Sequence, residues 1–267
     1  MSAARARLRL DPVQVLSVLV GIALVSPTLI VLPMSLTSID SFKFPPPGWS
    51  TQWYVSLATS QTWRGALLNS VVIACVVALL ATGLGTAAAL ALARGRPPVR
   101  GFLNAILISP LIVPTVIAAV GMYLVALNTH IVGTFAGFVL AHTCLAIPLV
   151  VISVAASLQS YDTRMDWAAA SLGATPWGTF RSVTLPLIAP GMFSGAVFAF
   201  VSSFDETVVA LFLVGPSLRT LPVLIYEGVL ETIDPRVAAA STLLFMLTTL
   251  LLVLVWLLAF RRPTGAR

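Results

Sequence analysis

Long apolar runs separated by short polar stretches dominate the chain. A helix that crosses a bilayer needs about 20 consecutive, mostly apolar residues. Six segments meet that length and are predicted as transmembrane helices: Val13–Ser35, Ala66–Ala93, Phe102–Leu127, Val132–Leu158, Gly191–Val214 and Val237–Phe260. The pattern therefore predicts an all-α membrane protein with six transmembrane helices.

The first apolar segment follows a basic stretch and so has the outline of a signal peptide. The basic residues are Arg5, Arg7 and Arg9. The apolar run is longer than a signal peptide requires, and no A-x-A cleavage pattern follows it. We therefore expect an uncleaved transmembrane helix here.

Composition supports a membrane protein and argues against two other classes. Hydrophobic residues make up 58% of the chain and charged residues only 9%, whereas an ordinary soluble domain carries about 25% charge. The net charge of +6 does not indicate nucleic-acid binding, because the basic residues lie between apolar blocks and form no single patch. Cys75 and Cys144 lie in apolar stretches without a CxxC motif, and we expect both to be small buried apolar residues.

The basic residues also predict the orientation of the chain. Six transmembrane helices place both termini on one side, together with the second and fourth connections. That side carries eleven arginines: Arg5, Arg7, Arg9, Arg94, Arg96, Arg100, Arg164, Arg181, Arg261, Arg262 and Arg267. The other side carries four basic residues: Lys43, Arg64, Arg219 and Arg236. Loops rich in Lys and Arg stay inside, so both termini are predicted to be cytoplasmic.

The segments and their connections give a complete predicted organisation. A basic cytoplasmic N-terminus (1–12) and the first helix (13–35) precede an extracytoplasmic loop (36–65) that contains the helix-breaking "PPP". A core of five helices follows (66–260), with a long cytoplasmic loop (159–190) and an outer loop (215–236). A cytoplasmic tail (261–267) ends the chain.

The long cytoplasmic loop begins with a pattern typical of a short helix. Asp162 or Thr163 can cap it, and Thr163 with Asp166 fits a capping box. Good helix formers follow, with three alanines at 168–170. Gly173 then stands where a left-handed turn would end the helix.

A second short helix is predicted after this turn. Thr175 is its cap and Pro176 its first residue, and Pro186 and Pro190 are expected to end it before the next transmembrane helix. Two short helices at an angle would form a compact knob. An amphipathic hairpin lying on the lipid headgroups is the alternative that the residues leave open.

At fixed spacing, this loop carries Ala168-Ala169, Gly173, Val183 and Leu185-Pro186. This pattern resembles the "EAA" loop of ABC importer permeases. The resemblance implies the type I ABC importer permease fold, in which the loop fits a cleft of the ATPase subunit and transmits its motion. The residues implied in coupling are Asp166, Trp167, Ala168, Ala169, Gly173, Ala174, Leu185 and Pro186.

One residue departs from the family pattern. Trp167 stands at the position of the family's glutamate, six residues before Gly173, and Asp166 comes one residue too early. An acidic group at position 166 lies on another face of the helix.

A further resemblance concerns the substrate. Residues 203–244 resemble the smaller permease subunit of spermidine/putrescine importers, and the overall likeness covers about 63–256. This implies polyamine uptake across the inner membrane, although related permeases serve other small amines or amino-acid-like solutes. It also implies a homologous second permease, two ATPase subunits and an extracytoplasmic binding protein as partners.

The energy source is expected to lie in a partner. A P-loop needs a Lys after Gly, and the only lysine, Lys43, follows Phe42. We therefore expect a non-catalytic transport subunit without a cofactor or metal of its own, with ATP and Mg²⁺ bound by the ATPase. An ion-coupled secondary transporter is the rival class, but it leaves the EAA-like loop unexplained.

Two adjacent acids interrupt the fifth apolar segment at "SSFDETVV". If the helix continues, Glu206 extends a seam of small residues that recurs every four positions: Gly191, Gly195, Ala199 and Ser203. Asp205 would follow Ser202 on a neighbouring sector. A carboxylate inside a membrane is costly, and no predicted transmembrane segment contains Arg or Lys. A partner subunit's cation or a cationic substrate would then compensate the charge, so Ser202, Asp205 and Glu206 are candidate substrate-path residues.

The last outer loop adds a second acidic group. Its candidate members are Tyr226, Glu227, Glu231 and Asp234. They would form either a solvated loop face or a cation-attracting mouth, and the nearby Arg219 and Arg236 would weaken such a mouth by neutralising it.

Overall fold

A computed structural model describes residues 12–94, 97–159, 162, 164–216, 218–231 and 234–260. Within these residues the chain is helical and contains no strand beyond an isolated bridge. It divides into two compact units, Met1–Thr59 with Gly228–Leu243, and Ser60–Glu227 with Leu244–Arg267. Arg5, Arg7, Arg9, Arg96 and the C-terminal arginines, which the orientation argument uses, lie outside the described residues.

The first unit contains α1 (Pro12–Met34) and α2 (Gln52–Thr59). The apolar side chains of α1 are largely exposed within this unit, as expected of a helix whose solvent is lipid. The Pro-rich loop between the two helices is held by Thr37, which pairs with Trp49 in a bridge and accepts a hydrogen bond on its carbonyl from Trp53 Nε1 at 2.8 Å. The loop is therefore ordered by a backbone bridge and a side-chain hydrogen bond where "PPP" excludes a helix.

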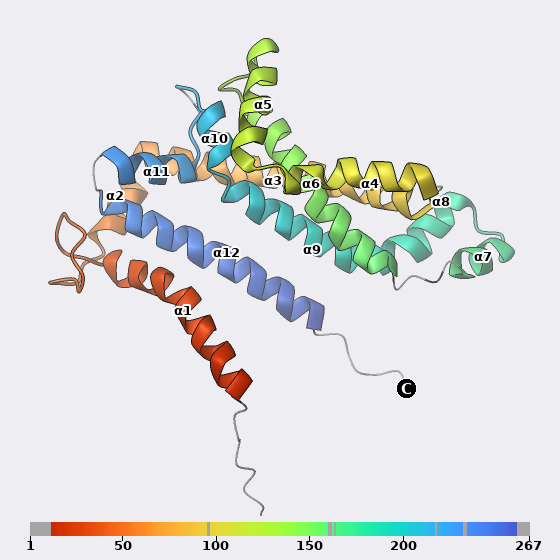
Figure 1. The fold of residues 1–267 in the computed structure, drawn as a ribbon, viewed down its shortest axis with the longest axis horizontal. Coiled ribbons are helices and arrows are strands. Elements are labelled where there is room, and N and C mark those ends of the chain that lie inside the picture. Colours follow the sequence, from red (N-terminus) through yellow and green to blue (C-terminus); the bar gives the residue numbers. More distant parts are fainter. Residues whose placement is uncertain are drawn as a thin grey trace, which may run out of the picture. The chain divides into compact units, whose positions relative to one another are not determined.

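The second unit is built around three long helices, α3 (Gln61–Arg94), α6 (Phe135–Gln159) and α9 (Leu185–Phe204). Figure 1 shows these helices packed along one another, and their buried faces form one apolar core. The shorter elements are α4 (Pro97–Ile112), α5 (Thr115–Asn128), α7 (Arg164–Ser171), α8 (Pro176–Thr179), the π-helical turn η1 (Phe180–Thr184) and α10 (Val208–Leu213). Two helices, α11 (Leu221–Glu231) and α12 (Arg236–Phe260), run across the boundary between the units.

Small residues allow close helix packing in this core. The predicted seam is confirmed, because Gly191, Gly195, Ala199 and Ser203 are all buried along α9. A Cβ added at Gly195 would lie 3.0 Å from the Cα of Val150 on α6. Larger residues at these positions would push α9 away from α6.

The third predicted segment is not one straight helix. It is divided into α4 and α5, which are bent by 104° at Val113–Pro114. Pro114 has no backbone N–H and forces the preceding residue out of helical geometry. The described residues therefore hold five helices long and apolar enough to span a membrane, or six when the bent pair counts as one.

The expected stop at Pro186 and Pro190 is wrong. The chain is helical from Pro176 through α8, η1 and α9 to Phe204. Pro186 lies directly after the π-helical turn, where the backbone hydrogen bonds have already shifted register, and a proline is tolerated in the first turn that follows. The second short helix of the loop is thus the start of the fifth transmembrane helix.

Candidate functional site

The turn at Gly173 has the geometry that its sequence predicts. Gly173 has φ +82°, a left-handed conformation that only glycine adopts without penalty. Its N–H donates to Ala170 O at 2.9 Å, and Ala174 N–H donates to Ala169 O at 3.1 Å. These two bonds make a Schellman motif, which ends α7 and reverses the chain within two residues.

The caps on both sides of this turn fix the loop further. Thr175 Oγ1 accepts a hydrogen bond from Gly178 N–H at 3.1 Å, and Pro176 is the first residue of α8, so this predicted cap is confirmed. Asp162 Oδ1 accepts from Arg164 N–H at 2.9 Å. The other proposed cap, Thr163, lies outside the described residues.

Large apolar side chains on the loop face outward. Trp167 is 75% exposed, Leu172 88% and Trp177 68%. Asp166 is half-buried instead, and its Oδ1 accepts a hydrogen bond from the buried Thr184 of η1 at 3.5 Å. The acidic residue next to the family's glutamate position is therefore engaged inside the loop, and Trp167 is the residue presented outward. No sequence signal identifies Thr184 as its partner.

The helix that should carry both acids ends before them. Asp205 N–H makes the last helical bond, to Val201 O at 3.0 Å, and α10 begins at Val208. Asp, Thr and Val are poor helix formers, and Thr207 Oγ1 bonds to Asp205 O at 3.3 Å, which competes with helical bonding. The expectation that Glu206 extends the α9 seam is therefore wrong, and Ser202 stands in the last helical turn.

The two carboxylates have different environments. Glu206 is half-buried, and its Oε1 accepts a hydrogen bond from Val209 N–H at 2.9 Å. It thereby caps α10, whose free N–H groups favour a negative charge. Asp205 is exposed, and its carboxylate has no partner among the described residues. Of the two acids, Asp205 is therefore the one whose carboxylate is exposed and unpaired within the described residues.

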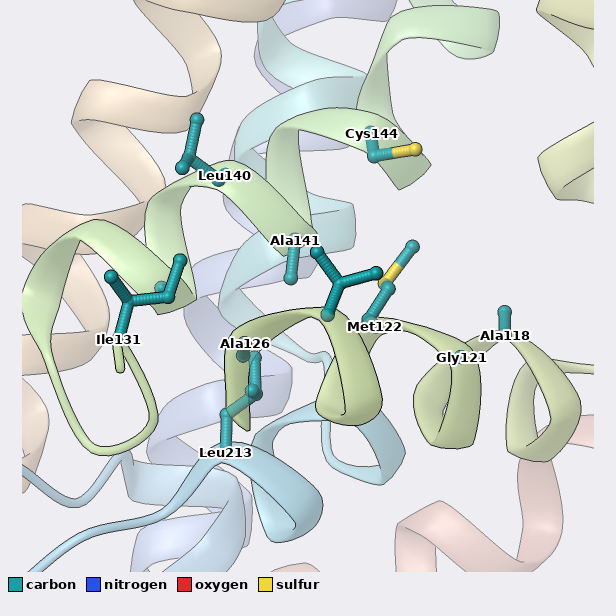
Figure 2. Close-up of a pocket in the computed structure, with 11 residues that line it drawn as sticks. Ala118, Gly121, Met122, Ala126, Ile131, Leu140, Ala141, Cys144 and Leu213 are labelled. Atoms are coloured by element: carbon teal, nitrogen blue, oxygen red, sulfur yellow. The ribbon is translucent and has the colours of Figure 1, made fainter. Parts of the chain in front are cut away.

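An apolar cavity of about 400 Å³ lies between α5, α6 and α10. Figure 2 shows its lining, which includes Met122, Ala126, Leu140, Cys144 and Leu213. The lining carries no charged side chain, so this cavity offers nothing to compensate a cation.

The expectation that both cysteines are buried is wrong, because Cys75 and Cys144 are exposed.

The acids of the loop that is predicted to lie outside are partly neutralised. Arg219 Nη1 donates to Glu227 Oε2 at 2.9 Å. In the other unit, Arg236 Nη2 lies 2.6 Å from Asp234 Oδ2. Tyr226 is exposed, and the side chain of Glu231 lies outside the described residues. The predicted mouth therefore stays a prediction, with two of its charges compensated by arginines.

These features define a multi-pass helical membrane protein with a rigid turn beside one end of a long helix and a free carboxylate at the other. Residues 80–263 match the family described as binding-protein-dependent transport system inner membrane component. The chain belongs to this family and is a non-catalytic permease subunit of an ABC importer in the inner membrane.

Relatives with known names agree with this assignment. The chain is 32% identical to the spermidine/putrescine transport system permease protein PotC of Escherichia coli K12, over 82% of this chain and 83% of the relative. It is 34% identical to the putrescine transport system permease protein PotI of the same strain, over 88% of each chain. It is also 34% identical to the molybdenum transport system permease protein ModB of Mycobacterium bovis, over 77% of this chain and 82% of the relative.

The fold is shared with solved transporters. A bacterial alginate ABC transporter in complex with a periplasmic protein superposes with a TM-score of 0.72 at 15% identity, over 96% of this chain and 95% of that chain. Permeases of this kind work with an ATPase and a substrate-binding protein and carry no cofactor themselves.

Proposed function

We propose that this permease moves polyamines such as spermidine or putrescine into the cytoplasm by alternating access. Its termini are cytoplasmic, so the loop 159–190 faces the ATPase and the Asp205 break lies toward the outside. A homologous second permease, two ATPase subunits that bind ATP and Mg²⁺, and an extracytoplasmic binding protein complete the importer.

One observation carries the mechanism. The coupling turn at Gly173 and the free carboxylate of Asp205 lie just beyond opposite ends of one helical stretch, Pro176–Phe204. At 1.5 Å per residue this stretch is roughly 40 Å long. A displacement of the turn by the ATPase therefore reaches the acidic break through a continuous helix.

Asp205 is also the feature that favours a cationic cargo. The polyamine relatives and the molybdenum relative are similarly identical to this chain, so overall identity does not decide the substrate. A free carboxylate in an apolar setting attracts cations and repels anions. Another small amine or an amino-acid-like solute is the second candidate, because a protonated amine would meet the same carboxylate.

The full importer in proteoliposomes tests the mechanism. With the binding protein outside and ATP inside, labelled putrescine is expected to accumulate, and vesicles that hold a proton gradient but no ATP are expected to take up none. Robust uptake without ATP would instead support the rival ion-coupled transporter. If ATP hydrolysis is stimulated when the binding protein carries a different solute, and never when putrescine is supplied, the polyamine assignment is wrong.

Trp167 is expected to be an anchor for the ATPase. It stands at the family's glutamate position and exposes 75% of its surface. Truncating a hot-spot tryptophan that is buried in an interface weakens the binding free energy by about 2 kcal/mol or more. Trp167→Ala should weaken copurification of the ATPase by roughly 30-fold in affinity. Trp49→Ala is the matched control, because Trp49 is 69% exposed on the Pro-rich outer loop. Equal ATPase recovery in both variants would contradict the anchor.

A further inference from the structure

A buried histidine links α6 to the end of α9. His142 is 1% exposed, and its Nδ1 lies 3.0 Å from Ser203 Oγ. Its Nε2 is buried and has no partner among the described residues. Because a buried imidazole is costly unless it is hydrogen-bonded, Ser203 is the group that makes His142 tolerable here. Ser203 lies only two residues before Asp205.

The other side of the acidic break is attached to the same helix. Gly133, in the turn that leads into α6, donates its N–H to Leu213 O at 3.0 Å. Gly133 and Gly215 approach so closely that a Cβ on Gly215 would lie 2.7 Å from the Cα of Gly133. Residues 203–215 are thus fastened to α6 and its leading turn at both ends, with Glu206 capping the helix between them.

We infer that His142 is a positioning residue, which holds the last turn of α9 through Ser203 so that Asp205 faces the substrate path. This inference rests on the proposed role of Asp205 in cation transport. The hydrogen bond to Ser203 is directional, whereas the ring contact of His142 with Phe138 and the burial of Phe204 are apolar. We expect that loss of this bond loosens the last turn of α9 and changes the position of Asp205, which lies two residues beyond Ser203.

Variants of the pair separate positioning from simple stability. His142→Asn places an amide near the site of Nδ1 and is expected to keep the bond and transport. The double variant His142→Leu, Ser203→Ala removes both polar groups, so neither is left buried and unpaired, and assembly should be normal. Its putrescine uptake per ATP hydrolysed is expected to fall about tenfold, in line with the loss of one hydrogen bond. Normal uptake in the double variant would overturn the inference.

A double-mutant cycle with Asp205→Asn tests whether the pair acts through Asp205. If it does, the double variant should cause no further loss of putrescine uptake in the Asp205→Asn background, because the carboxylate that the pair positions is already absent. Independent, multiplying losses would refute positioning and leave the proposed function intact. If Asp205→Asn alone transports normally, the proposed cation path itself fails, and the positioning role with it.

Discussion

A Gly173→Val variant is expected to insert and assemble normally but to take up little putrescine per ATP hydrolysed. The residue has φ +82°, and no atom of the described residues lies within 4 Å of a Cβ built there. Because a Cβ there has no neighbour among the described residues, the expected effect comes from the left-handed backbone, which costs an L-residue about 1–2 kcal/mol. Such a cost shifts the population of an intact turn by a factor of roughly 5–30, and we expect a comparable loss of coupled uptake.

Asparagine is the matched control at this position. It tolerates the left-handed region better than other non-glycine residues, so Gly173→Asn should keep most of the coupling although it adds a larger polar side chain. The measurements are ATPase activity and labelled uptake in the same proteoliposomes. If valine and asparagine reduce uptake equally, the bulk of the side chain at the ATPase interface matters, and the account based on the turn is wrong.

The turn and caps of this loop could be predicted because their signals are local. Ala168–Ala170, Gly173 and Thr175-Pro176 lie within about ten residues, and each acts on its own backbone hydrogen bonds. The buried seam of α9 could be predicted in the same way, because its period of four is a property of a single helix. Local chemistry alone therefore predicts the turn at Gly173.

The breaks in the helices could not be predicted in the same way. Pro148 lies inside the continuous α6 and Pro190 inside α9, whereas the chain bends by 104° at Pro114. The difference lies in packing, because α4 packs against α6 and α5 packs against α10. A proline permits a bend, and the distant partners of the two halves determine whether one forms.

The break at Asp205 follows the same logic. The helix ends at Phe204, and α10 stays in the same apolar core but packs beside α5. The residues that allow this are visible in the sequence, but the contacts between Gly133, Leu213 and Gly215 that require it are between segments about 80 residues apart. Because these contacts are distant in sequence, the local pattern predicts both acids on one helix, whereas they lie between α9 and α10.

Because Asp205 is exposed and Glu206 is bonded to α10, we expect opposite effects from substituting the two acids. Asp205→Asn keeps the size of the side chain and removes the one carboxylate that is exposed and unpaired among the described residues of this segment. Uptake of putrescine per ATP hydrolysed is expected to fall at least about tenfold, which corresponds to about 1.4 kcal/mol of lost stabilisation of a dication in the path. Assembly and basal ATPase activity should remain near normal, because this carboxylate has no partner in the described part of the chain.

Glu206→Gln is the internal control, because a glutamine Oε1 can still accept the hydrogen bond from Val209 N–H. Its uptake should stay within about twofold of the native importer, whereas Glu206→Ala removes the cap and should destabilise α10 by about 0.5–2 kcal/mol. That loss would be seen as reduced recovery of the assembled complex and not as reduced uptake per ATP. Equal transport defects in Asp205→Asn and Glu206→Gln would show that both charges contact the cargo. Normal transport in both would show that the acidic break serves the architecture alone, because the cap would then be the only function of the pair that the structure supports.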